Sequence, residues 1–132
     1  MGYKAKAEKE SSSTEVKYSM FIGRWQPLHK GHLWLINQRL KEGKNVWLAI
    51  RDVEPDEKNP WTAEEILDMV HEGELKDLIL DGRVMASIIP DIESINYGRG
   101  VGYDVIEHQP PKEIGDISAT SIREQMKKDG KL

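Results

Sequence analysis

The chain has 132 residues, 38% hydrophobic and 32% charged, which suits one folded domain. The absence of cysteine excludes disulfides, thiolate catalysis and cysteine-ligated zinc. A net charge of −4 without a basic face argues against nucleic-acid binding. The sequence has no apolar run long enough to cross a bilayer and no signal-peptide pattern, so we expect a cytoplasmic protein.

The first fifteen residues differ in character from the rest of the chain. They are charged, rich in serine and without an apolar period, so we expect residues 1–15 to be a disordered tail or a cloning remnant. From Val16 onward, apolar runs alternate with amphipathic stretches, and we expect one folded domain over residues 16–132.

The order of these stretches predicts an α/β fold. Runs rich in β-forming residues predict strands over 16–22, 46–50, 84–89 and 103–107. Helices are predicted from 31–32 to Gly43, from Thr62 (where Glu65 completes a capping box), over 74–80, and after 118–121. We therefore expect a three-layer sandwich with a mainly parallel sheet of four to five strands, and ligands at the carboxyl ends of those strands.

The loop after the first predicted strand carries the clearest functional motif. His29-Lys30-Gly31-His32 opens a predicted helix, where free backbone amides and the helix dipole favour an anion. Two imidazoles three residues apart can donate hydrogen bonds to phosphate oxygens, and Gly31 leaves room for a phosphate near the backbone. Surface or capping histidines are one alternative and a zinc site is another, although no third zinc ligand is indicated.

A second motif precedes the last predicted helix. Ser118, Thr120 and Ser121 gather hydroxyls at its start, and Arg123 lies one turn in. Hydroxyls, amides and an arginine at a helix N-terminus predict a second anion site, with an ordinary cap and a solvated arginine as the alternative.

Both motifs resemble signatures of a known superfamily. His29-Lys30-Gly31-His32 looks like the His-x-Gly-His signature of the nucleotidyltransferases with a cytidylyltransferase-like, Rossmann-like fold. Residues 117–123 resemble their second signature, Ile-Ser-(Ser/Gly/Thr)-Thr-x-x-Arg. The strings over 23–32, 59–64 and 89–93 are most similar to nicotinamide mononucleotide adenylyltransferases of the archaeal type, here in a shortened form.

The resemblance implies transfer of a nucleoside monophosphate, AMP in preference, from a nucleoside triphosphate to a small phosphorylated acceptor such as nicotinamide mononucleotide. His29 and His32 would bind the α- and β-phosphates, and Arg123 would hold the departing pyrophosphate. Mg²⁺ would accompany the triphosphate. The other residues expected at the nucleotide are Gly23, Arg24, Trp25, Gly31, Ser118, Thr120 and Ser121.

The chain departs from the resemblance on the acceptor side. Ile66 stands where relatives typically have an arginine that contacts the substrates, and the stretch after Asp91 is shorter. Residues 96–102 instead carry alternate glycines around Arg99, which indicates either an acceptor-binding loop or a plain turn. The residues expected at the acceptor are Arg51, Asp52, Trp61 and Arg99.

Two other functions remain open. A CTP-dependent cytidylyltransferase acting on a glycerol-phosphate-like acceptor would use the same two signatures. A nucleotide-binding protein without catalysis would account for Ile66 and for the shortened stretch. We also expect that a domain of this polarity can form a homo-oligomer.

Overall fold

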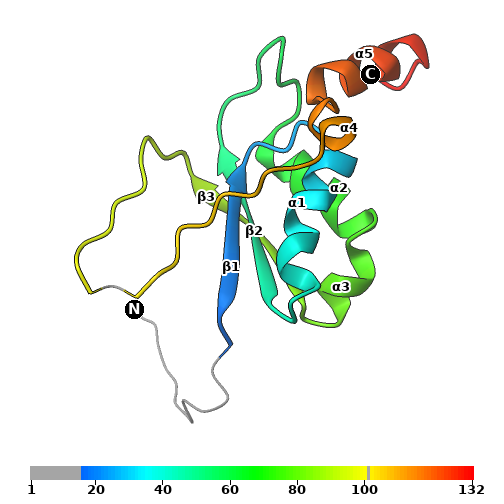
Figure 1. Cartoon of the computed structure of the whole chain (residues 1–132). Coiled ribbons are helices and arrows are strands. Elements are labelled where there is room, and N and C mark those ends of the chain that lie inside the picture. Colours follow the sequence, from blue (N-terminus) through cyan, green and yellow to red (C-terminus); the bar gives the residue numbers. More distant parts are fainter. Residues whose placement is uncertain (1–15, 101) are drawn as a thin grey trace.

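A parallel sheet organises the chain (Figure 1). The computed structural model describes residues 16–100 and 102–132, so the predicted tail over 1–15 lies outside the described residues. The strands pair in the order β1–β2–β3, both pairs parallel. The elements in chain order are β1 (Tyr18–Gly23), α1 (Lys30–Leu40), β2 (Asn45–Asp52), α2 (Ala63–Glu72), α3 (Lys76–Leu80), β3 (Val84–Pro90), α4 (Lys112–Gly115) and α5 (Ala119–Lys128).

The two faces of the sheet differ in what covers them. Val46, Leu48 and Ile50 of the central strand are fully buried in the core that the sheet forms with the helices. On the opposite face, Met20 and Met85 flank β2 and remain 42% and 37% exposed. Two successive right-handed crossovers in one direction place their helices on the same face, and Figure 1 shows α1, α2 and α3 together on one side.

Two predictions about the architecture are wrong for the described residues. They form three strands rather than four or five, and the helices α1–α3 cover one face only, so a three-layer sandwich is absent from this part of the chain. Residues 103–107 have the β-forming composition of a strand but pair with no neighbour. Tyr103 and Val105 are 79% and 76% exposed, which shows that β-propensity without a surface to pack on does not make a strand.

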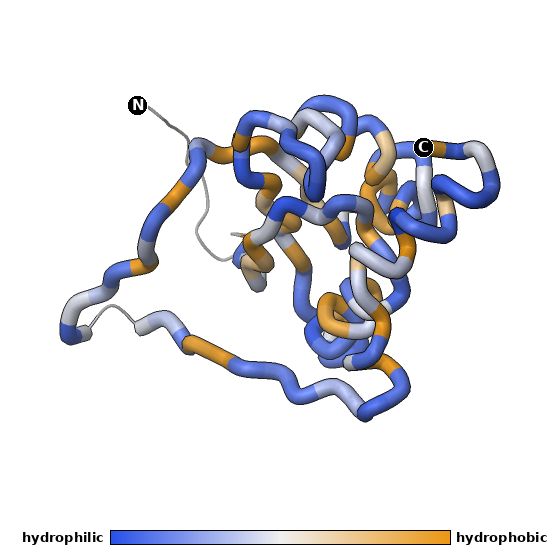
Figure 2. Tube along the Cα trace, turned by 90° about the horizontal axis from the view of Figure 1, so that it is seen from above, coloured by the Kyte–Doolittle hydropathy of each residue, from blue (hydrophilic) through white to orange (hydrophobic). Residues whose placement is uncertain are grey.

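Residues 91–100 and 102–111, which lie between β3 and α4, carry neither helix nor strand. Figures 1 and 2 show this connection swinging out from the body of the domain before it returns to α4. Figure 2 also shows apolar positions spaced along it, and five of its large hydrophobic side chains are exposed. They are Ile95, Tyr97, Tyr103, Val105 and Ile106.

The predicted helix boundaries agree well with the structure. Thr62 accepts a hydrogen bond from the Glu65 amide, and the Glu65 carboxylate accepts one from the Thr62 amide, which confirms the capping box of α2. Gly43, just past α1, has φ +79°, a conformation that favours glycine. The short α4 was not predicted. No helix within 16–100 and 102–132 combines the length and apolarity needed to cross a bilayer.

We predict that Thr62→Ala destabilises the domain because the Glu65 amide loses its acceptor at the start of α2. The expected loss is about 1 kcal/mol in the free energy of unfolding, measured by urea denaturation. Thr62→Ser keeps the hydroxyl and serves as the control. Equal loss in both variants would show that the methyl group, and not the cap, matters.

Candidate phosphate-binding site

The turn between β1 and α1 is held by a buried tryptophan. Trp25 adopts φ +55°, a left-handed conformation that costs a non-glycine residue about 1 kcal/mol or more. Its indole Nε1 donates to the carbonyl of Ala49 on β2 at 3.0 Å, which anchors the turn to the sheet. A Cβ on Gly23 would lie 3.0 Å from the indole ring, so this glycine makes room for Trp25.

His29 and His32 cap α1 through both of their rings. The Gly31 amide donates to His29 Nδ1 at 3.0 Å, and the His29 amide donates to His32 Nδ1 at 3.2 Å. The two rings stack with centroids 3.7 Å apart, and Trp25 meets His32 edge-on at 4.8 Å. The two backbone amides at the helix start are therefore satisfied by imidazoles before any ligand arrives.

This capping fixes the position of each imidazole proton. A nitrogen that accepts a hydrogen bond carries a lone pair, so in both neutral rings the proton lies on Nε2. Within the part of the chain that the structure describes, neither Nε2 donates to a protein group. The turn thus presents two neighbouring N–H donors with their tautomers already set, which suits an anion with several oxygens.

Gly31 makes room for neighbouring parts of the protein. It is buried, and a Cβ there would lie 2.9 Å from the Cε1 atom of His29 and 3.5 Å from the carbonyl of Ile114. The missing side chain therefore makes room for the His29 ring and for the approach of α4. Its amide is engaged by His29, so direct phosphate contact with this amide remains a prediction.

Both histidines are held in the neutral form. Burial lowers the pKa of His32 to about 4, and the neighbouring charge of His29 adds to this effect. Burial also lowers the pKa of His29. A polyphosphate beside the two rings would favour their charged forms and raise both pKa values.

Gln26 ties three parts of the site together, and sequence reasoning missed it. Its side chain is 5% exposed, with Nε2 donating to the Trp61 carbonyl (2.9 Å) and Oε1 accepting from the Trp61 amide (3.1 Å). Its own carbonyl accepts from Arg123 Nη1 at 2.6 Å. No spacing in the sequence indicates these contacts, because the partners are 35 and 97 residues away.

Arg123 links the second motif, at the start of α5, to the β1–α1 turn. Arg123 is half-buried and, besides Gln26, donates to Thr120 Oγ1 at 3.3 Å. Ser118 caps α5 by accepting from the Ser121 amide, and the two hydroxyls lie 2.8 Å apart. The structure thus brings Arg123 to the loop that carries His29 and His32.

Arg24 and Arg51, two other cations predicted at the site, contact acidic residues and a backbone carbonyl outside the histidine turn. Arg24 donates to the Glu54 carbonyl at 3.1 Å and lies 3.7 Å from the Asp56 carboxylate. Arg51 forms an ion pair with Asp91 at 2.7 Å, joining the carboxyl ends of β2 and β3. Their roles at the nucleotide and the acceptor remain predictions.

The predicted acceptor residues are not all brought together. Asp52 is exposed at the end of β2. Arg99 is exposed in the connection that swings out from the body, so this conformation does not bring it to the histidine turn. Trp61, by contrast, is joined to the turn through Gln26.

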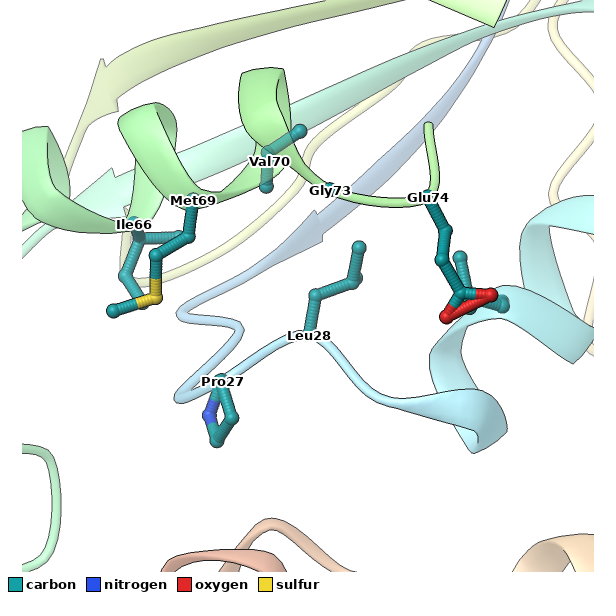
Figure 3. Close-up of a pocket in the computed structure, with 8 residues that line it drawn as sticks. Pro27, Leu28, Ile66, Met69, Val70, Gly73 and Glu74 are labelled. Carbon is teal, nitrogen blue, oxygen red and sulfur yellow. The ribbon is translucent and has the colours of Figure 1, made fainter. Parts of the chain in front are cut away.

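Ile66 lies in the core rather than at a charged site. It is 1% exposed and lines an apolar pocket of about 220 Å³ between α2 and the segment before α1 (Figure 3). Figure 3 shows the Leu28 side chain pointing toward α2 across this pocket, with the Glu74 carboxylate at its side. An arginine at this position would bring a charge into apolar surroundings.

A parallel α/β sheet with a histidine-capped helix directly after its first strand is typical of a Rossmann-like domain. Comparison with known proteins specifies it further. Residues 20–83 match the family described as cytidylyltransferase-like. This match confirms the resemblance to a cytidylyltransferase-like fold seen in the sequence.

Curated relatives are adenylyltransferases. Nicotinamide-nucleotide adenylyltransferase of Caldivirga maquilingensis is 35% identical over 77 residues, covering 57% of this chain and 43% of the relative. The nicotinamide/nicotinic acid mononucleotide adenylyltransferase of Acinetobacter baylyi is 40% identical over 40% of this chain and 29% of its own length. The nicotinamide-nucleotide adenylyltransferase of Thermococcus kodakarensis is 28% identical over 84% and 73%. The chain thus matches less than half the length of the first two.

We predict that acidification destabilises the domain through the two histidines. Their lowered pKa values mean that the unfolded chain, with an ordinary histidine value of 6.5, takes up protons before the folded one does. This contribution is fully present above 6.5 and is lost as the pH falls towards about 4.

The measurement is the free energy of unfolding across that pH range. His32→Asn keeps an acceptor for the His29 amide but cannot titrate, so its slope should be flatter. An unchanged slope would assign the pH dependence to other groups.

Proposed function

We propose that this protein is a nucleotidyltransferase that transfers AMP from ATP to a small phosphorylated acceptor, nicotinamide mononucleotide in the first place. The observation that carries the proposal is the stacked pair His29–His32, which presents two Nε2–H donors beside a loop bound by Arg123. The names of the relatives support the adenylyl group and the acceptor.

The reaction is a direct displacement at phosphorus. A phosphate oxygen of the acceptor attacks the α-phosphorus of ATP, a new P–O bond forms, and the bond to the β-phosphate breaks to release pyrophosphate. His29 and His32 would donate to oxygens of the α- and β-phosphates, and Arg123 would neutralise the leaving pyrophosphate with Ser118 and Thr120 nearby. No covalent bond to the protein is needed.

Neutral histidines suit this task. A neutral Nε2–H can donate to a phosphate oxygen while Nδ1 of the same ring keeps its backbone amide, so each ring would bind phosphate without giving up its cap. Mg²⁺ would arrive with the triphosphate. Within the described ranges no three His, Asp or Glu side chains gather as a metal cluster, so the phosphate oxygens would supply its main ligands.

We predict that His29→Ala and His32→Ala each lower pyrophosphate release by about 10²-fold to 10³-fold, because a donor to the transferring group is lost. His29→Asn separates two roles, since its Oδ1 can still accept from the Gly31 amide while the Nε2–H donor is gone. It should retain the stability of the fold and lose turnover.

His71→Ala is the matched control, since His71 is exposed on α2 and belongs to neither motif. Full turnover in both alanine variants of the turn would remove the histidines from the mechanism.

The second candidate function uses CTP, and the cytidylyltransferase-like family match favours testing it. We expect pyrophosphate release with ATP plus nicotinamide mononucleotide, and little with CTP plus glycerol phosphate. Pyrophosphate release with the CTP pair and none with the ATP pair would assign CTP as the nucleotide donor. Nucleotide binding without pyrophosphate from either pair would support the non-catalytic alternative that the buried Ile66 suggests.

A further inference from the structure

Gln26 is the one buried polar side chain in the core of the described residues. Its side-chain amide donates to the Trp61 carbonyl and accepts from the Trp61 amide, so both backbone groups of Trp61 are bound. Polar groups buried this deeply are costly unless they are satisfied, and here both ends of the amide are. The contact therefore fixes the β1–α1 turn against the segment that precedes α2.

The segments joined in this way are the ones that carry the site. Gln26 lies in the β1–α1 turn, three residues before His29. Trp61 is half-buried and directly precedes Thr62, the N-cap of α2, so its placement also sets where α2 begins. Arg123 binds the Gln26 carbonyl from the last helix.

We propose that Gln26 is a positioning residue that holds Trp61 against the histidine turn, so that the acceptor bound beside Trp61 lies in line with the phosphates held by His29 and His32. This inference rests on the proposed function. It assigns Gln26 an effect on the acceptor that acts through Trp61, and no direct contact with the nucleotide.

The test begins with Gln26→Glu, which has nearly the same shape. Its carboxylate can accept from the Trp61 amide but cannot donate to the Trp61 carbonyl. We expect the KM for nicotinamide mononucleotide to rise about tenfold, the factor that corresponds to one lost buried hydrogen bond. The KM for ATP should stay within about twofold, because the histidine turn keeps its own caps.

Gln38→Glu is the matched control. Gln38 Nε2 donates to the Trp34 carbonyl at 2.8 Å, a bond of the same kind within α1. Its loss should leave both KM values within about twofold of wild type. Gln26→Met removes both hydrogen bonds without adding a charge, and it provides a second variant should the buried carboxylate prevent folding.

A double-mutant cycle with Trp61→Ala decides whether Gln26 acts through Trp61. We expect the rise in acceptor KM caused by Gln26→Glu to disappear in the Trp61→Ala background. Additive effects, or an equal rise in both KM values, would overturn the assignment while leaving the proposed function intact. Absence of turnover in the wild type would remove both.

Discussion

The reciprocal capping of α1 by His29 and His32 is the interaction on which the candidate site depends. It satisfies the helix start, stacks the rings and sets both tautomers at once. The arrangement of the two rings depends on two neighbouring residues. Gly31 has no side chain that would meet the His29 ring, and Trp25, in a left-handed conformation, contacts the His32 ring at a right angle. The site is therefore built from the same contacts that hold the turn to the sheet.

Burial keeps the two capping histidines neutral in the free protein. Two stacked imidazoles, both partly buried, cannot readily carry charge without an anion nearby. In many phosphate sites the backbone amides of a helix N-terminus bind the anion. Here the amides of His29 and Gly31 already donate to imidazole nitrogens, so under the proposed function the two Nε2–H groups would be the donors to a phosphate.

Much of this architecture could be predicted from local sequence. Three of the predicted strands, the capping box at Thr62 and the helix starts that follow the two motifs depend on contacts within a few residues, and these elements were confirmed. The pairing of Gln26 with Trp61 depends on residues far apart in the chain, and so does the ion pair of Arg51 with Asp91. The strand predicted over 103–107 was wrong because composition does not say whether a partner is present.

The attachment of α5 has a consequence for how the two halves of the site respond to a ligand. This helix buries no side chain, and within the described residues one side-chain hydrogen bond, from Arg123 to Gln26, links it to the β1–α1 turn. Local opening of such a helix costs far less free energy than unfolding the sheet. An anion that bridges the histidine turn and α5 would close this weakest unit, so ligand binding would appear as slowed amide hydrogen exchange in the last helix before anywhere else.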